Sequence, residues 1–99
     1  MVDRLIWAPS ARQDLRDLFN YINEYNPDAA RQFIESIFEK VHSLPDYPHM
    51  GRVVPEFNDE HIREIIRAPC RIIYRVNLSD EQIEIVRIWH AARGAPRIT

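Results

Sequence analysis

The chain has few cysteines, glycines and lysines for its 99 residues. Cys70 is the only cysteine, which excludes an internal disulfide bond and a cysteine-based metal cluster. The two glycines, together with 45% hydrophobic and 28% charged residues, exclude a fibrous or low-complexity chain and are typical of a globular protein. His42, His49 and His61 lack the spacing of metal ligands, so we expect neither a metal nor another cofactor.

Long apolar runs are absent as well. No segment approaches the roughly 18 consecutive apolar residues of a membrane-spanning helix, and Met1 is not followed by the apolar core of a signal peptide. We therefore expect a soluble, cytoplasmic protein with no membrane partner. A length of 99 residues is near the common size of one domain, so residues 1–99 are expected to form a single domain around one small core.

The basic side chains are almost all arginine, because Lys40 is the only lysine beside twelve arginines. A guanidinium does not release its proton near neutral pH. This bias therefore disfavours lysine acid–base chemistry and favours bidentate contacts with carboxylates or phosphates. The formal net charge of −2 is too small to support indiscriminate binding of nucleic acid.

The start of the chain predicts a strand and then a helix. An apolar run at residues 4–8 is typical of a short strand, and Pro9 ends it. Ser10 then offers a helix N-cap, with Gln13 three residues later completing a capping box. The apolar stripe of this helix consists of Ala11, Leu15, Leu18, Phe19, Ile22 and Tyr25.

A second helix is predicted to begin at Asn26 and Pro27. Proline disfavours the helical conformation at the residue before it but fits a first helical turn, where Asn26 can act as the cap. Pro45 ends this helix. Its apolar stripe consists of Ala30, Phe33, Ile34, Ile37, Val41 and Leu44. Two helices joined this closely are expected to pack as an antiparallel hairpin.

The second half of the chain predicts a sheet. Residues 45–61 contain three prolines and few periodic apolar positions, which indicates an irregular loop. Residues 62–67, 70–78 and 82–89 then alternate as three strands with short turns, which predicts an antiparallel meander. The predicted fold class is α+β in the order β-α-α-β-β-β, with the helical hairpin packed on one face of a mainly antiparallel four-stranded sheet.

Arginine recurs every four residues along the first two strands of the meander, at Arg63, Arg67, Arg71 and Arg75. Side chains of a strand alternate between faces, so each strand presents its two arginines on one face. Ile72, Tyr74 and Val76 alternate with the arginines and are assigned to the core. We therefore expect the arginines on the outer face of the sheet.

Two interpretations of this outer face remain. Glu64 is the only acid between residues 61 and 78, so the face carries a local surplus of three positive charges that would bind acidic residues of a partner. In the alternative, the arginines pair with Glu56, Glu64 or Glu84, which is the ordinary arrangement of charges on a solvated sheet.

In the last strand, Val86 and Ile88 are expected in the core, and Arg87 is expected on the outer face with Trp89. The alternation is less regular here, because Ile83 and Ile85 share the face of Arg87.

Six segments carry a family resemblance. They are WAPSARQDLRDLFNYI at 7–22, NPDAARQFIESI at 26–37, LPDYPHMGRVVPEF at 44–57, IREI at 62–65, RIIYRV at 71–76 and HAAR at 90–93. In this order they resemble the ParE/RelE superfamily of toxins from bacterial toxin–antitoxin modules. The set spans nearly the whole chain and is more similar to the ParE branch, the plasmid-stabilisation toxins, than to the RelE branch.

The resemblance implies a helical hairpin laid against a mainly antiparallel sheet. ParE-like members inhibit DNA gyrase and block replication, whereas RelE-like members cleave messenger RNA on the ribosome. Both kinds are neutralised by a cognate antitoxin whose disordered tail folds onto the toxin. We therefore expect a toxin that binds gyrase without catalysing a reaction and that forms a hetero-oligomer with its antitoxin. The alternatives are a ribosome-dependent endoribonuclease and a non-toxic antitoxin-binding module.

The residues that the resemblance implies for RNA cleavage are incomplete. RelE-like enzymes use lysines, arginines and a late tyrosine, but Arg52 stands where such chains tend to carry lysines, and the last tyrosine, Tyr74, is expected in the core. An alternative nuclease set consists of Glu56, Arg71 and His90, because the resemblance aligns Arg71 with an arginine common in the superfamily. The other interpretation of His90 is a strand-end histidine that is hydrogen-bonded locally.

The residues expected to bind the target or the antitoxin are Arg63, Arg67, Arg71, Arg75, Arg87, Trp89, His90 and Arg93. Arg97 lies beyond the last matching segment, so the resemblance gives it no role. We add it to this surface from its position alone.

Overall fold

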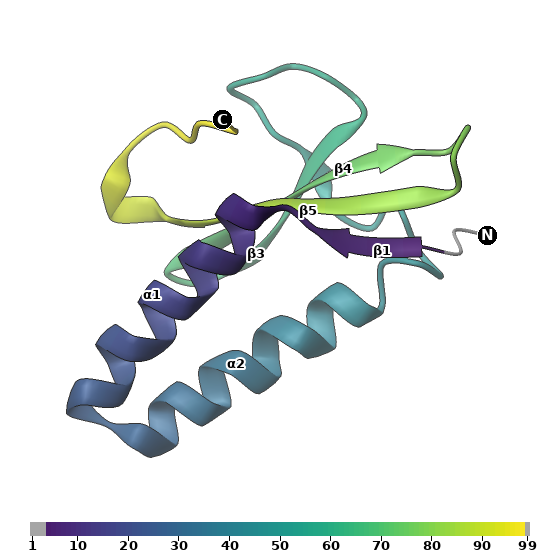
Figure 1. Ribbon diagram of the computed structural model, residues 1–99. Helices are drawn as coiled ribbons and strands as arrows, with labels where there is room; N and C mark the ends of the chain where they lie inside the picture. Colours follow the sequence, from purple (N-terminus) through teal and green to yellow (C-terminus); the bar gives the residue numbers. More distant parts are fainter. Residues whose placement is uncertain (1–3, 99) are drawn as a thin grey trace.

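The computed structural model describes residues 4–98. Its elements are β1 (Arg4–Trp7), α1 (Pro9–Tyr25), α2 (Pro27–His42), β2 (Arg52–Val53), β3 (Ile62–Arg67), β4 (Cys70–Asn77), β5 (Gln82–His90) and the short 3-10 helix η1 (Ala91–Arg93). The strands of these residues form one sheet in the order β1-β5-β4-β3-β2, in which the β1–β5 pair is parallel and the other three pairs are antiparallel. Both helices lie on one side of it (Figure 1).

The predicted α+β fold is confirmed, with one strand more than expected. The additional strand, β2, has two residues and lies inside the segment that the sequence indicates as a loop. It pairs with β3 at the edge of the sheet. Neither helix of the described residues is long and apolar enough to span a membrane.

The predicted capping box of the first helix is wrong. Helix α1 begins at Pro9, and the cap residue, Ala8, makes no side-chain hydrogen bond. Proline fits the first helical position, so the helix begins before Ser10 and leaves that residue inside the first turn. The Ser10 hydroxyl instead donates to the carbonyl of Val86 at 3.0 Å, and Gln13 bonds to Asp17.

The predicted start of the second helix is confirmed. The Asn26 side chain accepts a hydrogen bond from the backbone N–H of Ala29 at 3.1 Å, and Pro27 occupies the first helical position. The backbone N–H of Asn26 also bonds to Ile22, the last turn of α1. One residue therefore ends α1 and caps α2, which joins the helices into the expected hairpin.

The main core lies between the hairpin and the sheet. Its buried members from the helical half are Ala11, Phe33, Ile37, Val41 and Leu44. Those from the strands are Cys70, Ile72, Tyr74, Val76, Ile83, Ile85 and Ile88. Tyr25, which belongs to the predicted apolar stripe, is not part of this core: it lies at the far end of the hairpin and is 72% exposed.

The expectation of one core is wrong, because a second cluster lies on the outer face of the sheet. It consists of Val54, Ile62, Ile73, Val86 and Trp89, with Phe57 and Ile98 packed against it. The segment between β2 and β3 and the segment after η1 lie on the side away from the helices (Figure 1). The sheet is therefore buried on part of both faces.

A β-bulge causes the irregular alternation of apolar residues in β5. Ile73 pairs with Arg87, but its neighbour Tyr74 pairs with Ile85, so Val86 is an extra residue in β5. The residues before the bulge face the helices at odd positions, and those after it do so at even positions. Val86 consequently lies in the outer cluster, which contradicts its predicted place in the main core. Ile88 is confirmed in the main core.

Candidate functional site

The four arginines of β3 and β4 do not share a face, which corrects the predicted cationic surface. Arg67 pairs with Cys70 across the turn between the strands, so Arg67 and Arg63 point to the same side as Cys70, toward the helices. Arg71 follows Cys70 directly and points to the outer side, as does Arg75. A spacing of four residues keeps one face only along a single strand, and the two-residue turn reverses it.

The two helix-side arginines hydrogen-bond to α2 and to the loop that carries β2. Arg67 donates from Nε to the hydroxyl of Ser36 in α2 at 2.7 Å, and its guanidinium lies 5.3 Å from the ring centre of Phe33. Arg63 donates to the carbonyl oxygens of Gly51 and Glu60, at 2.9 and 3.0 Å. Arg63 therefore ties together the two ends of the loop that carries β2.

Tyr74 holds the same loop from the core, as its predicted burial requires. Its hydroxyl accepts from the N–H of Gly51 and donates to the carbonyl of Pro48, both at 2.9 Å. Burial raises the pKa of Tyr74 above its ordinary value. A Cβ at Gly51 would lie 2.5 Å from the backbone oxygen of Glu64, so only glycine allows this approach. Tyr74 is therefore engaged in structure.

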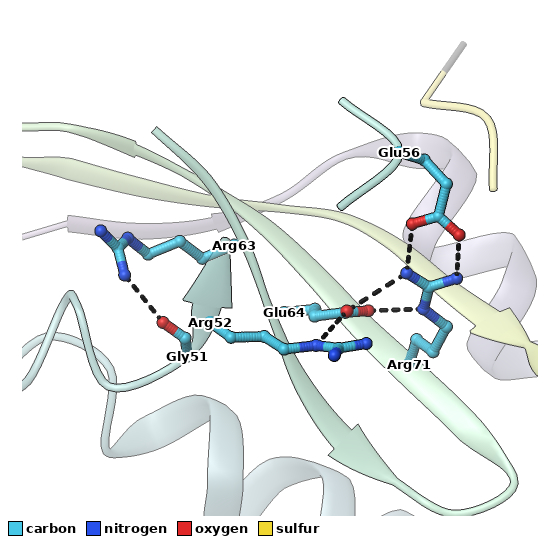
Figure 2. Close-up of polar contacts among 6 residues, drawn as sticks. All are labelled: Gly51, Arg52, Glu56, Arg63, Glu64 and Arg71. Carbon is cyan, nitrogen blue, oxygen red and sulfur yellow. Dashed lines mark hydrogen bonds and ion pairs between the residues drawn. The ribbon is translucent and has the colours of Figure 1, made fainter. Parts of the chain in front are cut away.

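The outer-side arginine Arg71 lies between two carboxylates (Figure 2). Its two terminal nitrogens donate to the two oxygens of Glu56 at 2.7 and 2.9 Å. Its Nε donates to one oxygen of Glu64 at 2.5 Å, and the other oxygen of Glu64 accepts from Nε of Arg52 at 2.7 Å. The Glu64 side chain is 0% exposed. We call these four residues the outer ion-pair network.

The charges of this network compensate one another. The hydrogen bonds from Arg71 lower the pKa of Glu56 from 4.5 to about 2, and the bonds to Glu56 and Glu64 raise the pKa of Arg71. Two guanidiniums and two carboxylates sum to zero. Arg75 likewise donates to Glu84 at 2.9 Å. These pairs are the ones that the sequence offered as the alternative to an unpaired cationic surface.

The set of Glu56, Arg71 and His90 is not assembled. His90 pairs with Cys70 in the sheet, which places it on the helix side, whereas Arg71 and Glu56 meet on the outer side. Nδ1 of His90 accepts from the backbone N–H of Ala92 at 3.0 Å, as its local interpretation predicts. His90 instead borders a hollow of about 170 Å³ that also contacts α1.

The predicted surface residues near the C-terminal end form a compact cluster around Trp89. The ring is buried, and the guanidiniums of Arg93, Arg87 and Arg97 lie 4.0, 4.9 and 6.0 Å from its centre. Its indole N–H donates to the carbonyl of Gly94 at 3.0 Å. Trp89 is therefore on the outer side, as expected, but it is covered by arginine side chains rather than open for stacking.

Asp14 is an important residue that the sequence reasoning missed. It lies on α1, accepts two hydrogen bonds from Arg87 at 2.7 and 2.8 Å, and accepts the backbone N–H of Ile88 at 3.0 Å. The hydrogen bonds that Arg87 donates to Asp14 raise the pKa of Arg87. A signal was present, since Asp14 lies three positions after Ala11 and four before Leu18, beside the apolar stripe.

Within residues 4–98, no group of three or more histidine, cysteine, aspartate or glutamate side chains could hold a metal ion.

Comparisons with known proteins agree with this fold. Residues 5–94 match the family model described as the ParE toxin of the type II toxin–antitoxin system parDE. A curated relative, Toxin RelE2 of Caulobacter vibrioides, is 32% identical over 90 residues, which cover 91% of this chain and 97% of the relative.

Two solved structures have a similar fold. The chromosomal ParDE system from P. aeruginosa superposes with a TM-score of 0.72 at 24% identity, over 90% of this chain and 96% of that chain. The RelBE2 toxin–antitoxin complex from Mycobacterium tuberculosis gives a TM-score of 0.57 at 18% identity, over 93% and 94%. The match to the family model extends over nearly all of the described fold. The chain therefore belongs to the ParE toxin family of type II toxin–antitoxin systems.

Proposed function

We propose that this toxin stops bacterial growth by binding a type II topoisomerase, DNA gyrase, without catalysing a reaction. Membership of the ParE family supports this target, because the resemblance of the sequence implies gyrase inhibition for ParE-like toxins. The observation that supports binding rather than cleavage is the separation of the candidate nuclease residues. Arg71 and Glu56 meet on the outer side of the sheet, whereas His90 lies on the helix side.

Cleavage of RNA would need a different arrangement. A base must take the proton of the 2′-hydroxyl, an acid must protonate the leaving oxygen, and free cations must contact the scissile phosphate. His90 lies on the other side of the sheet from Arg71, and Tyr74 is engaged in the core. These contacts favour a protein-binding role for the outer face.

We further propose that a cognate antitoxin neutralises this toxin by folding onto it. The neighbour from P. aeruginosa is a ParDE toxin–antitoxin system, and the neighbour from Mycobacterium tuberculosis is a complex of toxin and antitoxin. An antitoxin of the same kind would bind this chain as a hetero-oligomer. Mass measurement of the co-expressed pair tests this partner, and recovery of the toxin alone from co-expression would contradict it.

A supercoiling assay with purified toxin and gyrase tests the target. We expect loss of supercoiling or accumulation of cleaved DNA, and relief of both when the antitoxin is added. Unchanged supercoiling at saturating toxin would overturn the proposal, provided that the same toxin stops bacterial growth when it is expressed in cells without antitoxin. Absence of both effects would instead identify a non-toxic antitoxin-binding module.

A ribosome-dependent endoribonuclease is the second candidate, and the 32% identity to Toxin RelE2 favours it. In this case the toxin would cut messenger RNA at codon positions on translating ribosomes. The cuts would be lost in Arg71→Ala, and a loss in His90→Ala would give that residue a role despite its distance in the fold from the outer network. Mapping of RNA ends beside the supercoiling assay distinguishes the two candidates.

A further inference from the structure

The outer ion-pair network has the layout of a receptor for one carboxylate. Glu64 is fully buried; Arg71 donates to both of its oxygens, and Arg52 donates to one of them (Figure 2). One carboxylate thus holds two guanidiniums in fixed positions, which leaves one positive charge uncompensated. A largely buried guanidinium that retains a net charge needs a second anion.

Glu56 supplies that anion from outside the sheet. It comes from the loop after β2, and it meets the two terminal nitrogens of Arg71 with both oxygens. This two-pronged geometry is the one by which arginine recognises a carboxylate of another molecule. The Glu56 side chain is 34% exposed, whereas Glu64 is 0% exposed. Glu56 can therefore leave into water, while Glu64 cannot.

The pair borders a shallow hollow that is partly lined by apolar side chains. This hollow of about 300 Å³ is lined by Arg52, Pro55, Glu56, Ile66, Pro69 and Arg71, among others. Ile66 is 50% exposed beside the charged centre. An arginine surrounded by apolar side chains is typical of the centre of a protein interface. The net charge of −2 gives no general attraction for nucleic acid.

We propose that Arg71, fixed by Glu64 and flanked by Arg52, binds a glutamate or aspartate side chain of an acidic, partly apolar partner peptide, and that Glu56 is an internal competitor for this position. The incoming carboxylate replaces that of Glu56, so the network keeps its charge. The exposed Ile66 contacts the apolar side chains next to the acid. This site does not depend on gyrase, so failure of the supercoiling assay leaves it intact.

Competition by Glu56 lowers the affinity for the partner peptide by a measurable factor. A ligand that can bind only when Glu56 has left binds with an affinity reduced by the fraction of molecules in that open state. If the Glu56–Arg71 pair is closed in about nine of ten molecules, removing the competing charge raises the affinity about tenfold.

The experiment compares Glu56→Gln with the unchanged chain and with Glu60→Gln, a matched control in the same exposed loop. The probes are a fluorescent peptide of alternating leucine and glutamate, its counterpart with glutamine, and a labelled single-stranded oligonucleotide, all followed by fluorescence anisotropy. We expect Glu56→Gln to bind the glutamate peptide about tenfold more tightly, with no change for the glutamine peptide or in Glu60→Gln.

Three results would overturn the proposal: equal affinity of the unchanged chain and Glu56→Gln for the glutamate peptide, the same gain for the glutamine peptide, or a larger gain for the oligonucleotide. Arg71→Gln should abolish binding of the glutamate peptide. This variant leaves Glu64 buried with one partner fewer, so its circular dichroism is measured first. If it fails to fold, the comparison of Glu56→Gln with Glu60→Gln alone decides the outcome.

Discussion

Glu64 is the residue on which the outer face depends. A carboxylate without solvent contact is stable only when its oxygens are bonded to cations or donors, and here Arg52 and Arg71 provide those bonds. The two guanidiniums differ in exposure, because Arg52 is 60% exposed and Arg71 only 13%. The pair with Arg71 is therefore the one that matters most to stability, while the pair with Arg52 is screened by water.

Replacing Glu64 with glutamine is expected to lower the free energy of unfolding by about 3 kcal/mol, because the amide turns a donor toward two guanidiniums and leaves the charge of Arg71 less compensated. Urea denaturation measures this loss. Glu84→Gln, which removes the partner of the more exposed Arg75, serves as control and should cost less than about 1 kcal/mol. A smaller effect at Glu64 than at Glu84 would contradict this assignment.

Glu56 should give the protein a specific acid sensitivity. Its pKa in the folded chain is about 2, below its ordinary value of 4.5. A depressed pKa means that the stabilisation is complete above pH 4.5 and is lost as the pH falls toward 2. The loss is on the order of 1 kcal/mol, since solvent screens a carboxylate that is partly exposed.

The measurement is the difference in unfolding free energy between the unchanged chain and Glu56→Gln, from pH 6 down to pH 2. We expect this difference to shrink in the acid range as Glu56 becomes protonated in the unchanged chain. A difference that stays constant over this range would show that the bonds to Arg71 do not stabilise the charged form of Glu56.

At the scale of elements, helix α1 continues the hydrogen bonding to β5 beyond the end of β1. Strand β1 ends at Trp7, and Ala8 makes the last backbone bond to β5, at Ile85. Beyond this point two side chains of α1 continue the ladder, since Ser10 bonds to the carbonyl of Val86 and Asp14 accepts the N–H of Ile88. Residues four apart on a helix lie on one face, which lets both reach the strand.

We expect Asp14→Asn to lower the free energy of unfolding by about 2 kcal/mol, because the variant keeps an oxygen for the N–H of Ile88 but loses the charge that Arg87 meets. Asp17→Asn, at an exposed position of the same helix, is the control. Hydrogen exchange at Ile88 should become faster in the first variant only, because an asparagine that the charge of Arg87 no longer holds accepts this N–H less firmly. Equal exchange in both variants would mean that Asp14 does not hold the edge of β5.

The elements that the sequence predicts well are those whose signals are local. Helical periodicity, the Asn26 cap and the three alternating strands each follow from neighbouring residues, and all appear in the structure. The bulge at Val86 and the short strand β2 depend on partners distant in the chain, so their sequences carry no comparable pattern. The division of the arginines was missed because the turn before Cys70 decides the face of Arg71.

At the scale of the whole molecule, the sheet separates two apolar clusters of different origin. The hairpin covers one side, and the loop after β2 together with the C-terminal segment covers the other (Figure 1). The C-terminal segment is held by Trp89 through Gly94 and by Arg87 through the carbonyl of Arg97. These are contacts to β5, so the segment belongs to the fold as well as to the candidate binding surface.

A chain that ends at Arg93 should therefore fold less stably, by about 2 kcal/mol, which is the contribution of burying one side chain of the size of Ile98. Its outer cluster should also become open to solvent. In a Trp7→Phe background, where Trp89 is the only tryptophan, acrylamide should quench fluorescence more strongly in the shortened chain than in the full one. Unchanged quenching would show that the segment does not cover Trp89.

The two faces of β5 have separate partners, so they can change independently during evolution. Ile83 and Ile85 must remain compatible with the helices, whereas Val86 and Trp89 must suit the loop and the tail. A substitution in the tail that alters recognition of a new partner thus leaves the hairpin side undisturbed. Toxins built this way can diversify one side while the scaffold on the other stays constant.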